Sequence, residues 1–428
     1  MKETLANTSA KSPFELLASK KILLIVTGGI AAYKAAYLAR SLVKAGAKLR
    51  TILTEGGTKF ITPLSFEALT GGPVATSMWD RPQIDIEHIS WAQWADIVIV
   101  APASANFIAK LARGFACGLA EATILATKAP ILICPAMNTN MYENPATVDN
   151  LKLLSQRGYQ ILEADSGLLA CGSVGAGRLP EPEAILTTAL RILFKSPLAG
   201  YRVLVSAGAT MEAWDSIRYL SNRSSGKMGT HLALCSWLMG AETQVVMGPM
   251  VQTLGYSLPS YTEYRIESTN DLLSQMEKLI ENCDLLIMAA APADFRPKER
   301  VSGKIKKDIP VNSLALTGNP DILKTLHRLK KKGALWVGFA AESENLLERG
   351  KEKLIDKKLD FIVLNYAHGA KSAFGGDSTE LIVLNAQGKE IYNSGPLHKF
   401  SAAWNLLAQI LKDAALPKRT ALKDIHWK

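Results

Sequence analysis

Short runs of apolar residues alternate along the chain with longer stretches in which apolar positions recur every three or four residues. In the first half, the runs predict strands at residues 21–27, 48–54, 97–101 and 131–134. The stretches between them predict a helix that ends near Ala45, followed by helices at residues 57–69, 104–113 and 145–157. Runs without polar interruption, such as residues 97–101, are typical of strands buried on both faces of a parallel sheet.

The second half repeats this pattern. Apolar runs predict strands at residues 202–206, 243–247, 284–290, 335–340 and 360–364, and runs at 380–384 and 390–393 predict a hairpin. Each half opens with a β-branched run followed by small residues, at 28–31 and at 207–210, as at the start of a nucleotide-binding fold. We therefore expect an α/β protein with two Rossmann-like, doubly wound domains.

The length supports two domains, because 428 residues exceed one compact core. We expect a loose N-terminal extension over residues 1–19, a first domain over 20–195 and a second domain over 201–428. Residues 196–200, which include Pro197 and Gly200, are the expected linker.

Composition and charge narrow the class of protein. The 48% of hydrophobic and 21% of charged residues are ordinary for a soluble globular protein. The net charge of +10 divides into +4 over the first 195 residues and +6 over the rest. This even spread disfavours a nucleic-acid-binding arm and suits sites for anionic small molecules.

The spacing of the cysteines and the length of the apolar runs indicate the cellular compartment. The five cysteines are scattered and contain no CxxC pair, which disfavours a disulfide framework and a structural zinc site. No apolar run reaches the ~18 residues of a membrane span. We therefore expect a cytoplasmic protein with no membrane or nucleic-acid partner.

Small residues follow two predicted strands of the first half. Residues 28–31 either bind a phosphate through backbone amides and the helix N-terminus or form only a tight turn. Residues 101–106 either let a planar ring approach the backbone or cap a helix through Ser104.

Three further side chains could carry chemistry. Asn138 follows the strand at 131–134 and is either a carboxylate clamp or a turn residue. Cys171 lies in a Gly- and Pro-rich stretch that could form a lid, where an inert buried thiol fits poorly. His88, one short helix before a strand, is either structural or able to reach a site at the sheet edge.

These segments together resemble the flavin-containing cysteine decarboxylase family over about residues 20–190. The match consists of GGIAAYK from Gly28, the His88 segment, PxMNxxM over 135–141 and ACGxxGxGR around Cys171. One departure is Ser173, where many relatives carry an acidic residue, which leaves the fine tuning of the lid in question.

The resemblance implies bound FMN and oxidation of a substrate cysteinyl thiol by hydride transfer, followed by loss of CO₂ and return of hydride. It implies that His88 assists oxidation and decarboxylation, that Asn138 binds the carboxylate and that Cys171 donates the final proton. The FMN contacts that it implies are Gly28, Gly29, Ile30, Ala31, Thr54, Ala101, Pro102, Ser104 and Asn106.

Donor-rich motifs also mark the second half. The segment from Arg218 to Gly229 is dense in donors and small residues, but it is not a Walker motif because residue 221 is Ser. The lysine run 304–307 follows Asp294 by ten residues and is either a solvated face or a neutraliser of a triphosphate. Lys353 and Lys357 are four residues apart and so share one helix face.

The second half resembles the phosphopantothenate–cysteine ligase family over about residues 200–410, through SNxSSGKMG, AxADF, KIKK and GFAAE in order. This resemblance implies that CTP and Mg²⁺ activate phosphopantothenate as an acyl-cytidylate, which the amine of cysteine then attacks. It implies that Asn222 and Arg218 hold the intermediate and that Lys304 supports its formation. The metal ligands stay unassigned. The other implied nucleotide contacts are Met288, Ala289, Ala290, Asp294, Lys306, Lys307, Pro320, Asp321, Ile322, Leu323, Phe339, Lys353 and Lys357.

The order of the domains fits successive reactions, because the product of such a ligase is the substrate of such a decarboxylase. We therefore expect a bifunctional enzyme of coenzyme A biosynthesis that makes 4′-phosphopantetheine. A two-domain NAD(P) dehydrogenase lacks support because no GxGxxG motif with a distal acid is present. A non-catalytic flavin-fold regulator would lack His88, Asn138 or Cys171, and all three are present. The resemblance also implies a homo-oligomer of trimeric decarboxylase and dimeric ligase domains, which could combine into a dodecamer.

Overall fold

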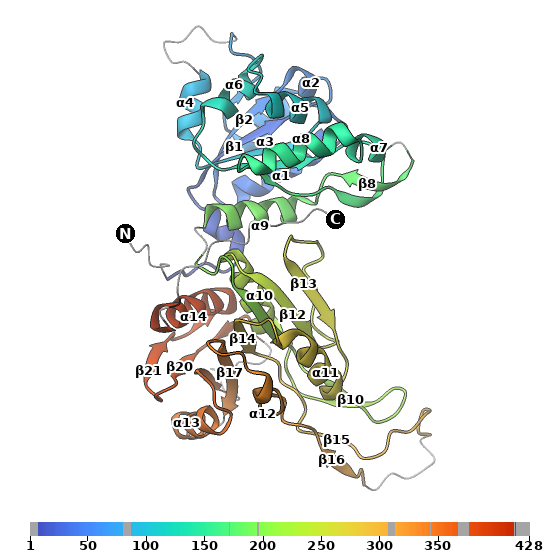
Figure 1. The fold of residues 1–428 in the computed structure, drawn as a ribbon, viewed down its shortest axis with the longest axis vertical. Coiled ribbons are helices and arrows are strands. Elements are labelled where there is room, and N and C mark those ends of the chain that lie inside the picture. Colours follow the sequence, from blue (N-terminus) through green and yellow to red (C-terminus); the bar gives the residue numbers. More distant parts are fainter. Residues whose placement is uncertain are drawn as a thin grey trace. The chain divides into compact units, whose positions relative to one another are not determined.

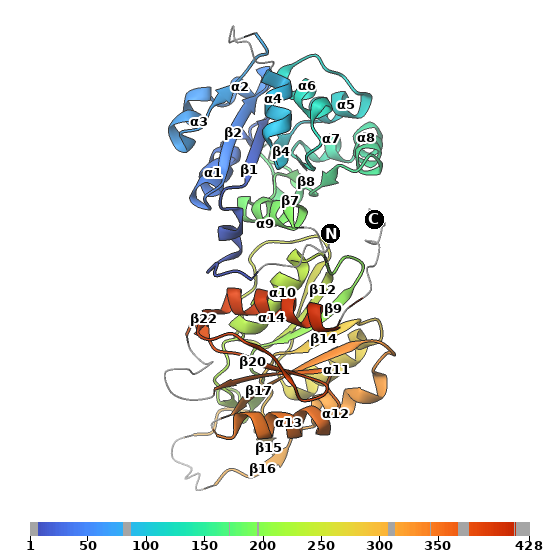
Figure 2. The ribbon, with the colours of Figure 1, turned by 90° about the vertical axis from the view of Figure 1, so that its left-hand side faces the viewer.

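The computed structural model describes residues 7–79, 87–170, 172–194, 197–306, 313–342, 344–366, 376–414 and 416. The chain divides into two compact units (Figures 1 and 2), one of Pro13–Phe194 and one of Met1–Ser12 with Lys195–Lys428. This division falls beside the limit expected at residue 195. Among the described residues, no helix is long and apolar enough to cross a bilayer.

The N-terminal unit is built on one parallel sheet with the strand order β3-β2-β1-β4-β5-β6. Its strands are β1 (Lys21–Val26), β2 (Lys48–Leu53), β3 (Val74–Ala75), β4 (Ile97–Ala103), β5 (Ile131–Pro135) and β6 (Gln160–Ile161). Residues 22–26 of β1 are fully buried, as their unbroken apolar run predicts. The doubly wound α/β fold expected from the sequence is confirmed.

Helices cover both faces of this sheet, with α1 packed on α3 and α9, and α5 packed on α8. The helical elements are η1 (Pro13–Leu17), α1 (Ala32–Lys44), α2 (Glu55–Thr58), α3 (Pro63–Thr70), α4 (Glu87–Trp94), α5 (Ala105–Arg113), α6 (Leu119–Ala126), α7 (Thr139–Tyr142), α8 (Pro145–Gln156) and α9 (Pro182–Leu193). The single helix predicted at 57–69 is two helices, because Pro63 lacks the N–H that a helix interior requires and starts α3 instead.

The Gly-rich stretch expected to be a lid contains a β-hairpin, β7 (Asp165–Leu168) paired with β8 (Val174–Arg178). Its tip is closed by hydrogen bonds from Leu169 N to Ser173 O and from Gly172 N to Leu169 O, both 2.9 Å. The glycines interrupt the apolar alternation by which a strand is recognised in a sequence, so the hairpin was not predicted.

The C-terminal unit contains a sheet with the order β13-β12-β9-β14-β17-β18-β20-β21, parallel from β13 to β18 and antiparallel beyond. The predicted hairpin is confirmed as β20 and β21. The strands of the unit are β9 (Arg202–Ala207), β10 (Met211–Ala213), β11 (Tyr219–Ser221), β12 (Glu242–Met247), β13 (Tyr261–Arg265), β14 (Leu285–Met288), β15 (Phe295–Pro297), β16 (Leu316–Gly318), β17 (Leu335–Glu342), β18 (Phe361–Tyr366), β19 (Ser378–Thr379), β20 (Ile382–Asn385), β21 (Glu390–Asn393) and β22 (Leu397–His398).

Helices also cover both faces of the second sheet, as Figure 2 shows within this unit. The helix α10 packs on β9 and on α14, whereas α11, α12 and α13 contribute to a core cluster around Trp336. The helical elements are α10 (Lys227–Leu238), α11 (Thr269–Ile280), α12 (Ile322–Leu326), η2 (His327–Leu329), α13 (Leu346–Asp356) and α14 (Lys399–Ala414).

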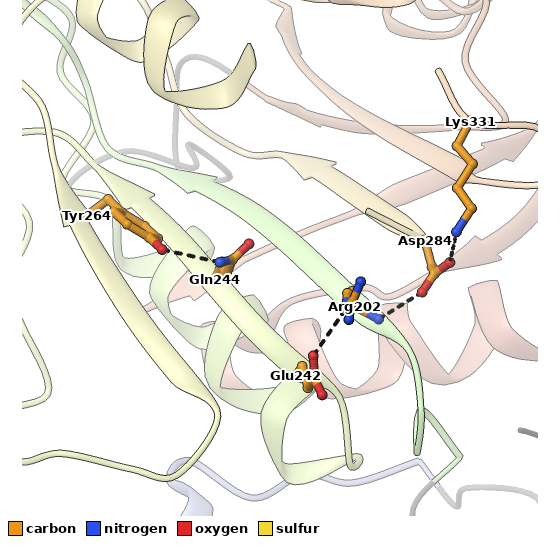
Figure 3. A network of polar contacts seen from close by, with 6 residues as sticks. All are labelled: Arg202, Glu242, Gln244, Tyr264, Asp284 and Lys331. Atoms are coloured by element: carbon orange, nitrogen blue, oxygen red, sulfur yellow. Dashed lines mark hydrogen bonds and ion pairs between the residues drawn. The ribbon is translucent and has the colours of Figure 1, made fainter. Parts of the chain in front are cut away.

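Polar contacts join the amino-terminal ends of three strands of this sheet (Figure 3). Arg202 donates its backbone N–H to Asp284 over 3.0 Å, and Lys331 lies 3.2 Å from the same carboxylate. The Arg202 side chain forms an ion pair with Glu242 at 3.2 Å. These contacts fix the strand ends opposite to the carboxyl ends, where parallel sheets bind their ligands.

Residues 7–12 belong to the C-terminal unit, although they come first in the chain. Asn405 on α14 accepts a hydrogen bond from Thr8 N at 2.9 Å and donates one to Thr8 O at 3.2 Å. The fully buried Ser401 donates its hydroxyl to Ala10 O. This segment, residues 7–12, is here called the N-terminal strap, and it differs from the loose extension that its lack of an apolar pattern suggested.

Part of the expected linker is also packed. Leu198 is fully buried and donates its N–H to Met239 O at 2.8 Å, so residues 197–200 belong to the C-terminal unit.

We predict that Asn405→Ala destabilises the C-terminal unit by about 1–3 kcal/mol, because it leaves the partly buried backbone N–H and C=O of Thr8 without their partner. Denaturant unfolding followed by tryptophan fluorescence would measure the change. Lys412→Ala, on an exposed position of the same helix, is the matched control. Equal unfolding midpoints for the two variants would show that the strap contributes nothing to stability.

Candidate active sites

The first candidate site lies where the order of the N-terminal sheet reverses, between β1 and β4. Thr27, which follows β1 and is 1% exposed, donates its hydroxyl to Pro102 O at 2.8 Å. The hydroxyl oxygen of Thr27 also accepts the N–H of Ser104, which follows β4, at 2.9 Å. The two loops are therefore held together at the carboxyl ends of neighbouring strands, the usual ligand position in such sheets.

A cavity of about 900 Å³ opens at this point and is lined by Gly28, Thr54, Ser104 and Asn106, among others. Ser104 caps α5 by accepting the N–H of Phe107 at 3.4 Å, and Thr54 caps α2 by accepting that of Gly57 at 3.2 Å. The capping role considered for Ser104 is thus confirmed, and the residue also lines the cavity.

Gly28 is required at its position because the backbone approaches another loop closely there. A Cβ at residue 28 would lie 3.0 Å from backbone atoms of Gly56. At Gly29 a Cβ would meet nothing within 4 Å, and Ile30 is 62% exposed. The turn that starts α1 is therefore open to the cavity, as backbone binding of a phosphate requires.

A second cavity of about 410 Å³ shares Gly28, Ser104, Ala105 and Met141 with the first. It is lined by residues 28–31, by Asn138 and by the start of the hairpin tip. Asn138 caps α7, since its Oδ1 accepts the N–H of Asn140 at 2.9 Å. The turn role and the cavity-lining position that the sequence left open for Asn138 therefore occur together.

Lys34 also lines the second cavity, and sequence reasoning missed it. It is 8% exposed, and its Nζ donates to Leu179 O at 3.1 Å and to Glu181 at 2.9 Å. Glu181 also pairs with Arg178 at 2.6 Å. A signal was present, because Lys34 lies four residues before Leu38 on the buried stripe of α1, and a charge there needs a partner.

The hairpin β7–β8 lies tightly against the segment that carries Asn138. Met137 N donates to Gly177 O at 2.9 Å. Gly177 has φ +129°, and a Cβ there would lie 2.2 Å from Met137 O. A glycine is thus required at 177, and the position of Asn138 depends on it.

Several predicted residues of the first half lie elsewhere. His88, on α4, is partly exposed and lines neither cavity. Ala101 and Pro102 are buried behind the first cavity and do not line it. Cys171 lies outside the described residues.

The second candidate site is a pocket of about 290 Å³ at the carboxyl ends of β14, β17 and β18. It brings together several predicted residues, namely Asn222, Ala289, Ala290, Asp294, Phe339, Lys353 and Lys357. The start of α10 lines it too, through Gly226, Lys227 and Gly229. A Cβ at Gly229 would lie 2.6 Å from the Cβ of Ala207, so this glycine lets α10 approach β9.

Asn222 bridges this pocket to the loop after β14. Its Nδ2 donates to Pro292 O at 2.9 Å and to Ala291 O at 3.2 Å. The orientation of the amide is therefore set by the backbone of that loop.

Two lysines from the end of α13 are held by carboxylates from other elements. Lys353 bonds to Glu342 at the end of β17, and Lys357 lies 3.3 Å from Asp321, the residue that caps α12. Burial alone would raise the pKa of Glu342, but its contacts with Lys353 and Arg349 outweigh burial and hold that pKa below its usual range.

Other predicted residues of the second half do not line the pocket. Arg218 is held on the arm between β10 and β11 by Asp215 at 3.0 Å, and Lys304 and Lys306 are exposed. Met288 is buried inside β14, and Lys307 lies outside the described residues. The turn of residues 320–323 is joined to the pocket through the contact of Asp321 with Lys357.

Comparison with known proteins identifies both units. A family model described as Flavoprotein matches residues 11–193, and one described as DNA/pantothenate metabolism flavoprotein C-terminal domain matches residues 198–414. The chain is 38% identical over 410 residues to the coenzyme A biosynthesis bifunctional protein CoaBC of Bacillus subtilis, with 95% of this chain and 99% of that protein covered. For CoaBC of Haemophilus influenzae the identity is 41% over 369 residues, with 85% and 91% covered. A solved C-terminal domain of a CoaBC protein is 32% identical over 51% of this chain and 100% of that one, with a TM-score of 0.42.

The chain thus combines a flavoprotein domain with a pantothenate-metabolism domain. It belongs to the family of CoaBC bifunctional proteins of coenzyme A biosynthesis. It is an enzyme with two activities, ligation of cysteine to 4′-phosphopantothenate and decarboxylation of 4′-phosphopantothenoylcysteine. Both family resemblances seen in the sequence are confirmed, and the dehydrogenase and regulator alternatives are excluded.

We predict that Gly177→Ala lowers CO₂ release from 4′-phosphopantothenoylcysteine by tenfold or more. The added Cβ must push the hairpin away from Met137, and overpacking of this kind costs about 1–3 kcal/mol. Gly158→Ala is the control, because Gly158 also has a positive φ (+93°) but nothing within 4 Å of its Cβ. Similar rates for the two variants would show that the hairpin does not position Asn138.

Proposed function

We propose that the N-terminal unit binds FMN in the cavity between β1 and β4. The observation that carries this proposal is the open turn at Gly28, which lies at the reversal of strand order beside a cavity of about 900 Å³. The N-terminus of α1 and the amides of residues 28–31 suit the phosphate, while Thr54, Ser104 and Asn106 supply polar groups. When bound, FMN supplies the hydride acceptor and donor of the decarboxylase reaction.

The second cavity is the proposed site of the substrate. Asn138 binds the carboxylate there, because it lines the cavity and a side-chain amide can donate an N–H to a carboxylate oxygen. Cys171 follows Ala170 in the sequence, and Ala170 lines this cavity together with Leu168 and Leu169, so we assign to Cys171 the donation of the proton that completes the product. Lys34 and Arg178 line the second cavity and place positive charge there.

His88 is proposed to act between copies of the chain. It lines neither cavity of its own unit, and Trp79 at the mouth of the larger cavity is 84% exposed. We infer that a trimer of N-terminal units covers this face and brings His88 of one copy to the FMN site of another. Dimeric C-terminal units would then permit a dodecamer.

Incubation with 4′-phosphopantothenate, cysteine and CTP, followed by mass spectrometry, tests both reactions in succession. The wild-type chain should yield 4′-phosphopantetheine. We predict that Cys171→Ser retains flavin but accumulates the unsaturated enethiol product after CO₂ loss, since the hydroxyl is a far weaker acid than the thiol. Formation of 4′-phosphopantetheine by Cys171→Ser at the wild-type rate would exclude Cys171 as the proton donor.

In the C-terminal unit, we propose that CTP binds across the start of α10 and the ends of β14 and β17. The support is electrostatic, because Lys227, Lys353 and Lys357 all line this pocket together with a helix N-terminus. Phe339 supplies an apolar side chain in the pocket lining. Met288 and residues 320–323, which do not line the pocket, are proposed to support the residues that contact the nucleotide. Among the described lining residues Asp294 is the only carboxylate.

Mg²⁺ is proposed to enter with the triphosphate. No cluster of three or more His, Cys, Asp or Glu ligands occurs among the described residues. Mg²⁺ is commonly held by one or two carboxylates together with substrate phosphates, and Asp294 fits that arrangement.

We predict that Lys304→Gln blocks formation of the acyl-cytidylate, whereas Asn222→Asp lets it form but retains it poorly. Lys304 offsets charge that builds up in the first step, an effect commonly worth several kcal/mol. A carboxylate at 222 would repel the phosphate-bearing intermediate. Pyrophosphate release without cysteine, with a search for protein-bound intermediate, separates the two roles. Normal pyrophosphate release by Lys304→Gln would show that Lys304 lies only on a solvated face.

A further inference from the structure

Three residues on one wall of the C-terminal pocket belong to no predicted motif. They are Asn365 at the end of β18, Thr379 in β19 and Lys399 at the start of α14, and all three line the pocket. The ladder of β19 with β22 pairs Thr379 with Leu397, two residues before Lys399. We call these three residues the Lys399 wall.

Lys399 is a buried cation, and no described carboxylate pairs with it. It is 3% exposed, and its Nζ donates to Gly376 O at 2.6 Å, but it forms no ion pair with any described residue. The nearby Asp377 is engaged by Lys227 at 2.6 Å. Burial first, and then Lys227, lower the pKa of Lys399. An anion beside Nζ would reverse this by favouring the charged form, and an ammonium group has three N–H donors to offer it.

Asn365, in contrast, requires a hydrogen-bond donor. Its side-chain oxygen Oδ1 is shielded from solvent and has no hydrogen-bond partner among the described residues. A buried acceptor left unpaired costs about 1–3 kcal/mol, so native structures rarely contain one without a reason. Since Asn365 lines the pocket, a ligand that carries an N–H or O–H donor would satisfy it.

Lys399 requires an anion and Asn365 requires a hydrogen-bond donor, and these two requirements together indicate which substrate of the enzyme binds here. A phosphate group would satisfy Lys399 but has no donor for Asn365 at neutral pH, so a nucleotide would have to place a second group, a ribose hydroxyl or the base amine, against Asn365. An α-amino acid carries a carboxylate and an amine on one carbon and so satisfies both. We propose that the Lys399 wall is the binding site of the amino-acid substrate, with Lys399 holding the carboxylate of cysteine and Asn365 the amine.

The proposal rests on the ligase activity and gives the wall a part in its second step. The amine first loses its extra proton to solvent. Its nitrogen then forms a bond with the acyl carbon of the intermediate, the bond from that carbon to the phosphate oxygen breaks, and CMP leaves with the electron pair. The nitrogen releases a second proton to solvent as the amide forms. Lys227 and Lys399 favour the first proton loss, because nearby positive charge lowers the pKa of an ammonium group.

The test compares cysteine with cysteamine, which carries the same amine and thiol but no carboxylate. In the wild-type chain cysteine should be the better acceptor in kcat/KM. In Lys399→Gln we expect kcat/KM for cysteine to fall about tenfold or more, while that for cysteamine changes far less, because a charge-assisted hydrogen bond to the carboxylate is lost. Lys399→Arg should recover part of the preference. Asn365→Ala should weaken both acceptors, since both use the amine.

Lys412→Gln, the same change on an exposed position of α14, is the matched control and should keep the wild-type ratio of the two acceptors. Pyrophosphate release without cysteine reports the first step separately. A raised KM for CTP in Lys399→Gln with an unaltered ratio of cysteine to cysteamine would assign the wall to the nucleotide and overturn the proposal. A wild-type chain that releases no pyrophosphate would instead overturn the CTP-dependent ligase function itself.

Discussion

A buried hydroxyl at the end of the first strand of each sheet holds the binding region in place. In the N-terminal unit, Thr27 accepts the N–H of Ser104 across the reversal of strand order. In the C-terminal unit, Ser206 on β9 accepts the N–H of Ala290, which follows β14, at 3.1 Å. Where the loops after two neighbouring parallel strands run to opposite faces of the sheet, a crevice opens between them. The backbone amides that line this crevice need hydrogen-bond partners. A short hydroxyl side chain supplies one while leaving the crevice unfilled, so the glycines and polar side chains around it can face a ligand.

The two crevices differ in the charge of the side chains that line them, and this difference matches the ligands that we propose for each. The C-terminal pocket gathers four lysines, namely Lys227, Lys353, Lys357 and Lys399. Lys353 and Lys357 are held by Glu342 and Asp321 from other elements, so their positions are set before a ligand arrives. In the larger N-terminal cavity, Lys59 and Lys110 are matched by Glu55 and Glu121, and small or neutral polar residues surround Gly28.

The elements that the sequence predicted well are those whose side chains are buried on both faces. Apart from Lys21 at the start of β1, strands such as β1 and β4 have no polar position to obscure the pattern. The hairpin β7–β8 was not predicted, because Gly175 and Gly177 are selected by close contacts with Thr139 and Met137 and not by strand propensity. Asn222, Lys353 and Lys357 were found through motifs, and the structure brings them to one pocket. Asn365 and Lys399 could not be found in this way, since a single Asn or Lys in a sequence carries no sign of whether its partner is missing.

The N-terminal strap has a consequence for how such a chain can be made and divided. Thr8 and its partner Asn405 are separated by 397 positions, so the strap cannot reach its final place before α14 has been synthesised. Until then the strap is a free strand of polypeptide and α14 has an uncovered polar face. A gene split between the two catalytic halves would also leave the strap on the wrong product. A C-terminal unit separated from residues 7–12 would therefore lose the hydrogen bonds that Thr8 and Ala10 make with α14.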